Sequence, residues 1–139
     1  MRPAVLLLFS LGLGAAGWTE LAGRKPWPVP APAKAKKNPV PASAESIAVG
    51  RKLYRGHCLI CHGARGHGDG PWVSKLPDPP ANLADPGVLA PMTDGEIFWK
   101  ISQGRDFMPG YEGKLSVAER WHVVNYLRTL VQPPRKGTH

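Results

Sequence analysis

Cysteine and methionine are scarce in this chain of 139 residues, which contains two cysteines and three methionines. Two thiols cannot form the several disulfide bridges of a small secreted scaffold, and they are too few for a four-cysteine zinc site. Long apolar runs are also lacking, because the run at residues 3–18 falls just short of the length that spans a bilayer as a helix. A chain of this length is expected to form one domain, which excludes a multidomain enzyme.

Acidic residues are in the minority, with ten Asp and Glu against 18 Lys and Arg. The basic surplus lies outside the middle of the chain, because residues 43–132 hold ten basic and nine acidic residues. The other basic residues lie in the first 42 residues and in the basic C-terminal tail at 133–139. We therefore predict no nucleic-acid partner. A basic arm beside a membrane surface is an equally natural use of this charge.

Residues 1–17 have the pattern of a signal peptide or an N-terminal membrane anchor. Arg2 supplies a positive charge, an apolar stretch follows at 4–16, and Gly14 and Ala16 suit a cleavage site. Cleavage and retention as an anchor both stay open at this point. In either case we expect a periplasmic protein, which is free after cleavage or tethered to the inner membrane through its N-terminus.

Residues 18–43 form a Pro/Ala/Lys-rich linker, and six prolines lie within 24–43. Proline fixes φ and removes a backbone donor, so we expect neither helix nor sheet in this segment. The expected state of residues 24–43 is an extended, polyproline-like spacer or tether that reaches about 60 Å when fully extended.

Three segments of the following region, residues 44–132, show helical periodicity, and no strand pattern appears in it. The second and third segments begin with a hydroxyl residue that is followed three places later by glutamate. This spacing predicts capping boxes at Thr93 and Ser116. The predicted helices cover 44–57, 93–104 and 116–131.

Between the first two helices, residues 63–92 are rich in Gly, Pro and Asp and are predicted to be loop, with a short helical turn near 72–76. An irregular stretch of this length is unusual in a compact domain. We therefore expect something other than peptide to fill the centre of the fold.

The two cysteines stand in a Cys-x-x-Cys-His motif formed by Cys58, Cys61 and His62, which is the attachment signature of a c-type haem. Each thiol adds to one vinyl group of the porphyrin, and the adjacent imidazole binds iron on the proximal side. Two alternatives are a thioredoxin-like thiol pair, which requires a βαβ setting, and a zinc site completed by His57, His62 or His67.

A six-coordinate haem needs a second axial ligand, and we expect it to be Met108. This residue lies in a non-helical segment after the second predicted helix, and Pro109 stiffens that segment. Met92 directly precedes the predicted cap at Thr93 and is expected at the surface. His67 is the alternative histidine ligand, and an open iron site is the remaining alternative.

These residues make the chain similar to class I monohaem c-type cytochromes of the exported bacterial kind, over about residues 44–131. The resemblance implies a small all-α cytochrome c fold, in which three main helices and long loops enclose one covalent haem. It also implies that the first and last helices cross at close range. The motifs that carry it are Gly50-x-x-Leu53-Tyr54, Cys58-x-x-Cys61-His62, Met108-Pro109 and Tyr126-Leu127.

The resemblance further implies which other residues contact the haem or its ligands. A carbonyl in the stretch 77–80, best placed at Pro80, is expected to accept a hydrogen bond from the far nitrogen of His62. Trp99 and Tyr111 are expected to line the haem pocket and are candidates to hydrogen-bond a propionate. Arg105 is a candidate to pair with one.

The predicted function is single-electron transfer by haem c with His62 and Met108 as the axial ligands of its iron, without enzymatic activity. The expected partners are redox protein donors and acceptors outside the cytoplasm, and the expected state is a monomer or a subunit of a respiratory complex. The alternatives are a haem subunit of a larger membrane complex and a ligand-binding haem sensor with a labile sixth ligand.

Expression with a haem-attachment system should yield an intact mass, under denaturing conditions, equal to the polypeptide plus one haem. The same mass shows whether residues 1–16 have been removed. A polypeptide without haem, in a host whose attachment system works on a control cytochrome, would contradict the haem prediction and favour the thiol or zinc alternatives.

Overall fold

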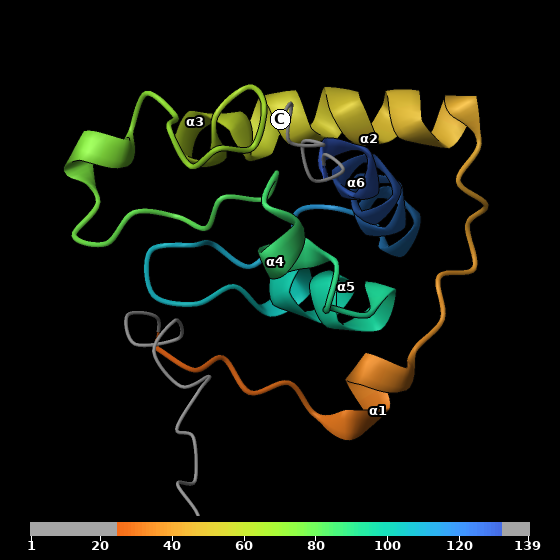
Figure 1. The fold of residues 1–139 in the computed structure, drawn as a ribbon. Helices are drawn as coiled ribbons and strands as arrows, with labels where there is room; N and C mark the ends of the chain where they lie inside the picture. Colours follow the sequence, from red (N-terminus) through yellow and green to blue (C-terminus); the bar gives the residue numbers. More distant parts are fainter. Residues whose placement is uncertain (1–24, 132–139) are drawn as a thin grey trace, which may run out of the picture.

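The computed structural model describes residues 25–131, and Figure 1 shows that this part of the chain is built from helices joined by long loops. Within it, the only strand-like pairing is an isolated bridge between Arg105 and Met108. The all-α prediction is therefore confirmed. The elements are α1 (Ala31–Ala35), α2 (Ala44–His57), α3 (Leu59–His62), the 3-10 turn η1 (Val73–Lys75), α4 (Pro86–Leu89), α5 (Asp94–Gln103) and α6 (Val117–Leu130).

Residues 1–17 and 133–139, which carry the predicted signal or anchor and the predicted basic tail, lie outside the described residues. Among residues 25–131, no helix has both the length and the apolar character that a membrane span requires.

The three predicted main helices are confirmed, and their caps explain where they begin. Ser116 and Glu119 form the complete capping box at the start of α6, with each side chain accepting from the other residue's backbone N–H, at 3.1 and 2.8 Å. At the start of α5, the Thr93 hydroxyl accepts from the Glu96 N–H at 3.1 Å. The reciprocal half predicted there is wrong, because the Glu96 carboxylate pairs with Lys100 at 2.9 Å.

Two short helices were not predicted, α3 and α4, and α4 lies within the predicted loop at 63–92, where η1 occupies the position of the predicted helical turn. α3 follows α2 after a single residue. The second, α4, begins after Asp85, whose side chain accepts from the Gly87 N–H at 2.8 Å, and Pro86 occupies its first turn. Asp before Pro is a helix-start signal, but four residues are too few to show a helical period.

The close crossing of α2 and α6 is the main contact of the fold, and Figure 1 shows α6 passing beneath α2. A Cβ placed on Gly50 would lie 2.0 Å from the His122 carbonyl oxygen and 2.8 Å from the Tyr126 Cβ. Only glycine permits this approach. Four residues along α2, the fully buried Tyr54 ring packs on the Tyr126 ring with 5.2 Å between centroids. The crossing implied by the resemblance is therefore present.

α5 packs on the other side of α6 through aromatic and cationic contacts. Phe98 stacks on Trp121 with 4.0 Å between ring centroids. The buried guanidinium of Arg120 lies 4.7 Å from the Phe98 centroid and donates to the Ser102 hydroxyl. No buried side-chain nitrogen or oxygen lacks a hydrogen-bond partner in the described part of the chain.

Residues 25–43 differ from the extended spacer predicted for them. They lie against the domain and include α1, whose proline occupies the first turn, where a missing N–H costs nothing. Val29 is buried, and the Lys34 carbonyl accepts from the Thr93 hydroxyl at 2.7 Å. The Asn38 amide donates to the Asn125 side chain at 2.7 Å. The prediction that this stretch forms no helix is wrong, because proline at the start of α1 is compatible with a first helical turn, and proline content carries no information about docking.

Replacing Gly50 by alanine should lower the free energy of unfolding by about 1–3 kcal/mol, because the new methyl group overlaps the α6 backbone. Gly56→Ala in the same helix is the matched control, because no atom lies within 4 Å of the Cβ position there. This control should raise stability by up to about 1 kcal/mol through helix propensity. Denaturant unfolding of both holoproteins measures the difference, and equal effects would contradict the close crossing.

Candidate haem-binding site

The Cys-x-x-Cys-His motif forms one compact turn at the end of α2. Cys58 is the junction between the two helices, as the C-cap of α2 and the N-cap of α3. Its carbonyl accepts from the N–H groups of Cys61 and His62, at 3.2 and 2.9 Å. Both thiols are free and half-buried. The structure therefore brings the two predicted attachment atoms and the predicted iron ligand together on a single turn.

A glycine-rich loop folds back under this turn and satisfies its carbonyl groups. Gly68 and Gly70 donate their N–H groups to the carbonyls of His62 and Cys61, at 2.8 and 3.1 Å. Gly63, at the C-cap of α3, has φ of 82°, a left-handed conformation that favours glycine. A Cβ on Gly70 would lie 2.4 Å from a backbone oxygen of α3, so the loop can pass this close only without a side chain.

The His62 imidazole is half-buried, and its Nδ1 lies 3.4 Å from the Ala81 carbonyl oxygen. Burial lowers the pKa of His62 below its usual range, and the Ala81 carbonyl opposes this effect more weakly. A neutral imidazole that donates from Nδ1 leaves Nε2 to bind iron. The expected carbonyl of Pro80 is therefore replaced by that of the next residue. The Pro80 carbonyl instead faces Gly68, whose Cβ position would lie 2.7 Å from it.

Tyr111 lies beside the attachment turn. It is buried, and burial raises the pKa of Tyr111 to about 12, with smaller contributions from Cys58 and Cys61. Its hydroxyl donates to the His57 carbonyl at 2.8 Å, so it does not have the free donor expected for a propionate. Burial likewise raises the pKa of Cys58 to about 12, and Cys61 adds to this shift.

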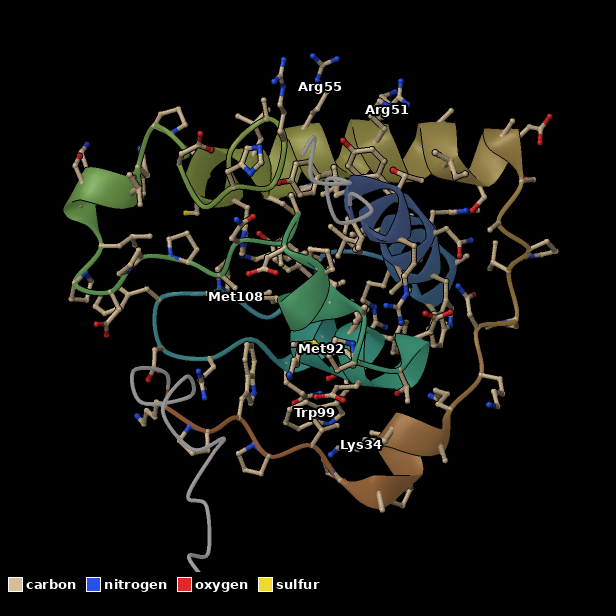
Figure 2. All side chains as sticks on the ribbon, in the orientation of Figure 1. Lys34, Arg51, Arg55, Met92, Trp99 and Met108 are labelled. Carbon is tan, nitrogen blue, oxygen red and sulfur yellow. The ribbon has the colours of Figure 1, made fainter. Side chains whose placement is uncertain are left out.

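Met108 lies on the loop between α5 and α6, which Figure 2 shows to the left of α5. Its backbone N–H and carbonyl pair with those of Arg105, both at 2.9 Å, and its side chain is half-buried against the core. Met92 is half-buried too, and its sulfur accepts from the Lys100 ammonium at 3.5 Å. Of Met92 and Met108, only Met92 has a hydrogen-bond donor to its sulfur among the described residues.

Within residues 25–131, the histidines other than His62 lie at the surface or against α2. His57 and His67 are exposed, and the His57 ring meets the edge of the Tyr111 ring. His122 is half-buried, with its Nδ1 2.8 Å from the Ser46 hydroxyl oxygen. The sequence did not indicate Ala81 as the partner of His62, because the resemblance implied a carbonyl within 77–80, which ends one residue before it.

Trp99 and Arg105 face the N-terminal segment, in contrast to their predicted roles at the propionates. Figure 2 shows Trp99 near that segment, and it lines a small hollow together with Ala33 and Lys36. Arg105 donates to the carbonyls of residues 25 and 26 and stacks over Trp27, with 4.5 Å to the ring centroid. The predicted propionate roles did not take account of these contacts, because the N-terminal segment was expected to be an undocked spacer.

These residues fit a covalent haem. Two free thiols and an imidazole with one nitrogen available share a turn, and a thioether lies on a separate loop that also borders the core. The alternatives lack support in residues 25–131. No group of three or more His, Cys, Asp or Glu side chains is arranged there to hold a metal ion, and no βαβ unit is present.

Comparison with known proteins agrees with this geometry. Residues 45–127 match the family described as cytochrome c oxidase, cbb3-type, subunit III. A solved chain of the reducing HAO-like protein complex of Kuenenia stuttgartiensis is similar, with 25% sequence identity and a TM-score of 0.59. The similarity covers 81% of this chain and 54% of that chain, so this chain spans about half the length of that relative. No curated protein matches the sequence.

Tyr111→Phe should lower the free energy of unfolding by about 1 kcal/mol, because the His57 carbonyl loses its hydrogen bond beside the attachment turn. Tyr126→Phe, which keeps the ring packed on Tyr54, is the control. Denaturant unfolding of the holoproteins compares the two. A loss no larger than that of the control would show that the Tyr111 hydroxyl does not support the turn.

Proposed function

Because the chain belongs to the family of cytochrome c oxidase, cbb3-type, subunit III, we propose that it transfers single electrons through one haem c held by His62 and Met108. Its membership makes it a c-type cytochrome with covalently bound haem. One observation carries the proposal further: Cys58, Cys61 and His62 share a turn in which the imidazole donates from Nδ1 toward Ala81 and leaves Nε2 for iron.

When bound, the haem supplies a one-electron couple between Fe(II) and Fe(III). The chain's part is to attach, orient and shield this group. Cys58 and Cys61 fix it in place, and the Ala81 carbonyl orients the His62 ring and raises its donor strength. The Met108 thioether favours the reduced state. If His62 and Met108 both bind the iron, no coordination site would remain for a substrate, which supports an electron carrier without enzymatic activity.

We place this function outside the cytoplasm, in the periplasm, with redox proteins as donors and acceptors. The apolar N-terminal pattern and the haem-attachment motif support this location. The family description and the similar solved chain both refer to parts of larger complexes, which supports a role as a subunit.

The docking of residues 25–43 favours a subunit over a freely moving carrier if residues 1–17 stay in the membrane. Only residues 18–24 would then separate the anchor from the folded body. Seven residues reach about 25 Å at full extension, in place of the longer reach expected for an undocked linker. Such a domain stays close to partners in the same membrane assembly.

Met108→Ala should lower the midpoint potential and allow carbon monoxide to bind the reduced protein, because iron loses a ligand that favours Fe(II). Met92→Ala is the matched control and should leave the potential unchanged. Redox titration and carbon monoxide difference spectra measure both. An unchanged potential in Met108→Ala would contradict the ligand assignment, and carbon monoxide binding by the unaltered reduced protein would favour the ligand-binding sensor.

A further inference from the structure

The first described residues of the chain bind the loop that carries Met108. The Arg105 guanidinium donates from Nη1 to the carbonyl oxygens of Lys25 and Pro26, at 3.2 and 2.8 Å. The same guanidinium lies 4.5 Å from the centroid of the Trp27 ring, and the Lys100 ammonium lies 5.5 Å from it. Two cations from α5 and the following loop therefore contact one aromatic ring of the N-terminal segment.

Arg105 links this contact directly to Met108. Its backbone N–H and carbonyl make both hydrogen bonds of the tight turn that ends at Met108, each at 2.9 Å. A shift of the Arg105 backbone therefore moves Met108, while the Arg105 side chain is held by residues 25–27.

The Met108 turn has little support of its own. Asp106 has φ of 52°, which is the left-handed region and is unfavourable for a residue with a side chain. Phe107 is 67% exposed, so its ring adds little to the core. The turn follows Gly104, which also has a positive φ, of 65°. A turn with these features needs contacts from outside to keep one conformation.

The segment that supplies those contacts is itself fixed. Residues 25–38, the N-terminal strap, are anchored again at Thr93, whose hydroxyl donates to the Lys34 carbonyl, and at Asn125, which bonds Asn38. A Cβ on Gly95 would lie 2.2 Å from the Ala33 carbonyl oxygen, so α5 and the strap are in close backbone contact. Trp27 is therefore presented by an anchored segment.

We propose that Trp27 and Arg105 are positioning residues for the methionine ligand. Through their contacts, the N-terminal strap binds the 104–110 loop and keeps Met108 in place. The strap thus limits how often the sixth coordination position opens. This proposal rests on the proposed function, because it requires Met108 to be the ligand.

Loss of the contact between the strap and Arg105 should raise the fraction of protein in which Met108 is displaced from the iron. Removing the cation–aromatic contact in Trp27→Ala should raise it roughly fivefold. Arg105→Gln, which also loses the charge-assisted bonds to two carbonyls, should raise it about tenfold or more. Trp27→Phe keeps an aromatic ring beneath the guanidinium and should restore most of the wild-type behaviour.

The test uses the full-length holoprotein with each of these substitutions. The rate of carbon monoxide binding to the reduced protein reports how often Met108 leaves the metal. The long-wavelength methionine-to-iron charge-transfer band of the oxidised protein reports the fraction ligated, and neither measurement depends on a redox partner. Arg51→Gln is the matched control, because this guanidinium also lies over an aromatic ring, 5.8 Å from the Tyr126 centroid, but on the outer side of α2 (Figure 2).

The proposal expects faster carbon monoxide binding and a weaker band in Trp27→Ala and Arg105→Gln, with Trp27→Phe and Arg51→Gln close to wild type. Rates in Trp27→Ala and Arg105→Gln equal to that of Arg51→Gln would overturn it. If the alanine variant does not accumulate as holoprotein, Trp27→Leu keeps apolar bulk while removing the aromatic face, and the same expectations apply to it.

Met108→Ala separates this proposal from the one on which it rests. If this variant keeps the charge-transfer band, the ligand assignment is wrong and the strap proposal falls with it. If Met108→Ala loses the band while both strap variants behave as wild type, the ligand assignment stands and the strap proposal alone is overturned.

Discussion

The close approach of α2 and α6 at Gly50 is the constraint on which the attachment site depends. It lets the Tyr54 ring pack against Tyr126 in the core, and the Tyr54 hydroxyl then donates to the Gly63 carbonyl at 2.7 Å. This bond joins α2 to the first residue after the Cys-x-x-Cys-His turn. Burial raises the pKa of Tyr54, with smaller contributions from nearby groups, so the hydroxyl stays a donor. The position of the attachment turn is therefore fixed by the packing of α2, the helix that leads into it.

The two sides of the candidate haem site are therefore built differently. The His62 side continues a long helix, and its turn is bonded by Tyr54, Tyr111 and the glycine loop. The Met108 side is an irregular loop with a left-handed Asp106; its ends are bonded to α5, and the strap adds outside support at Arg105. Thioether bonds from Cys58 and Cys61 would keep His62 near the metal. Met108 has no such bond, so its position depends on the packing of its loop.

The sequence predicted those parts of the structure that follow from local chemistry. The bounds of α2, the cap of α6 and the attachment residues follow from helical period, capping residues and a motif with a chemical reason for its spacing. Glycine at position 50 indicated the helix crossing only through the resemblance to cytochromes. The partner of His62 and the roles of Trp99 and Arg105 depend on how distant segments meet. Arg105 and its two carbonyl partners are about 80 residues apart, and no local pattern links them.

The docked strap also changes where the charge of the protein lies. Residues 43–132 are nearly neutral, but the folded body extends back to residue 25 and holds 14 basic and nine acidic residues over 25–131. Lys34 lies in α1 and Lys37 directly precedes the anchored Asn38, so the backbones that carry these charges occupy fixed positions on the body. Charges at fixed positions give a directed field, whereas charges on a loose arm average over many orientations. An acidic redox partner would therefore meet an oriented surface, which favours one docking geometry over many.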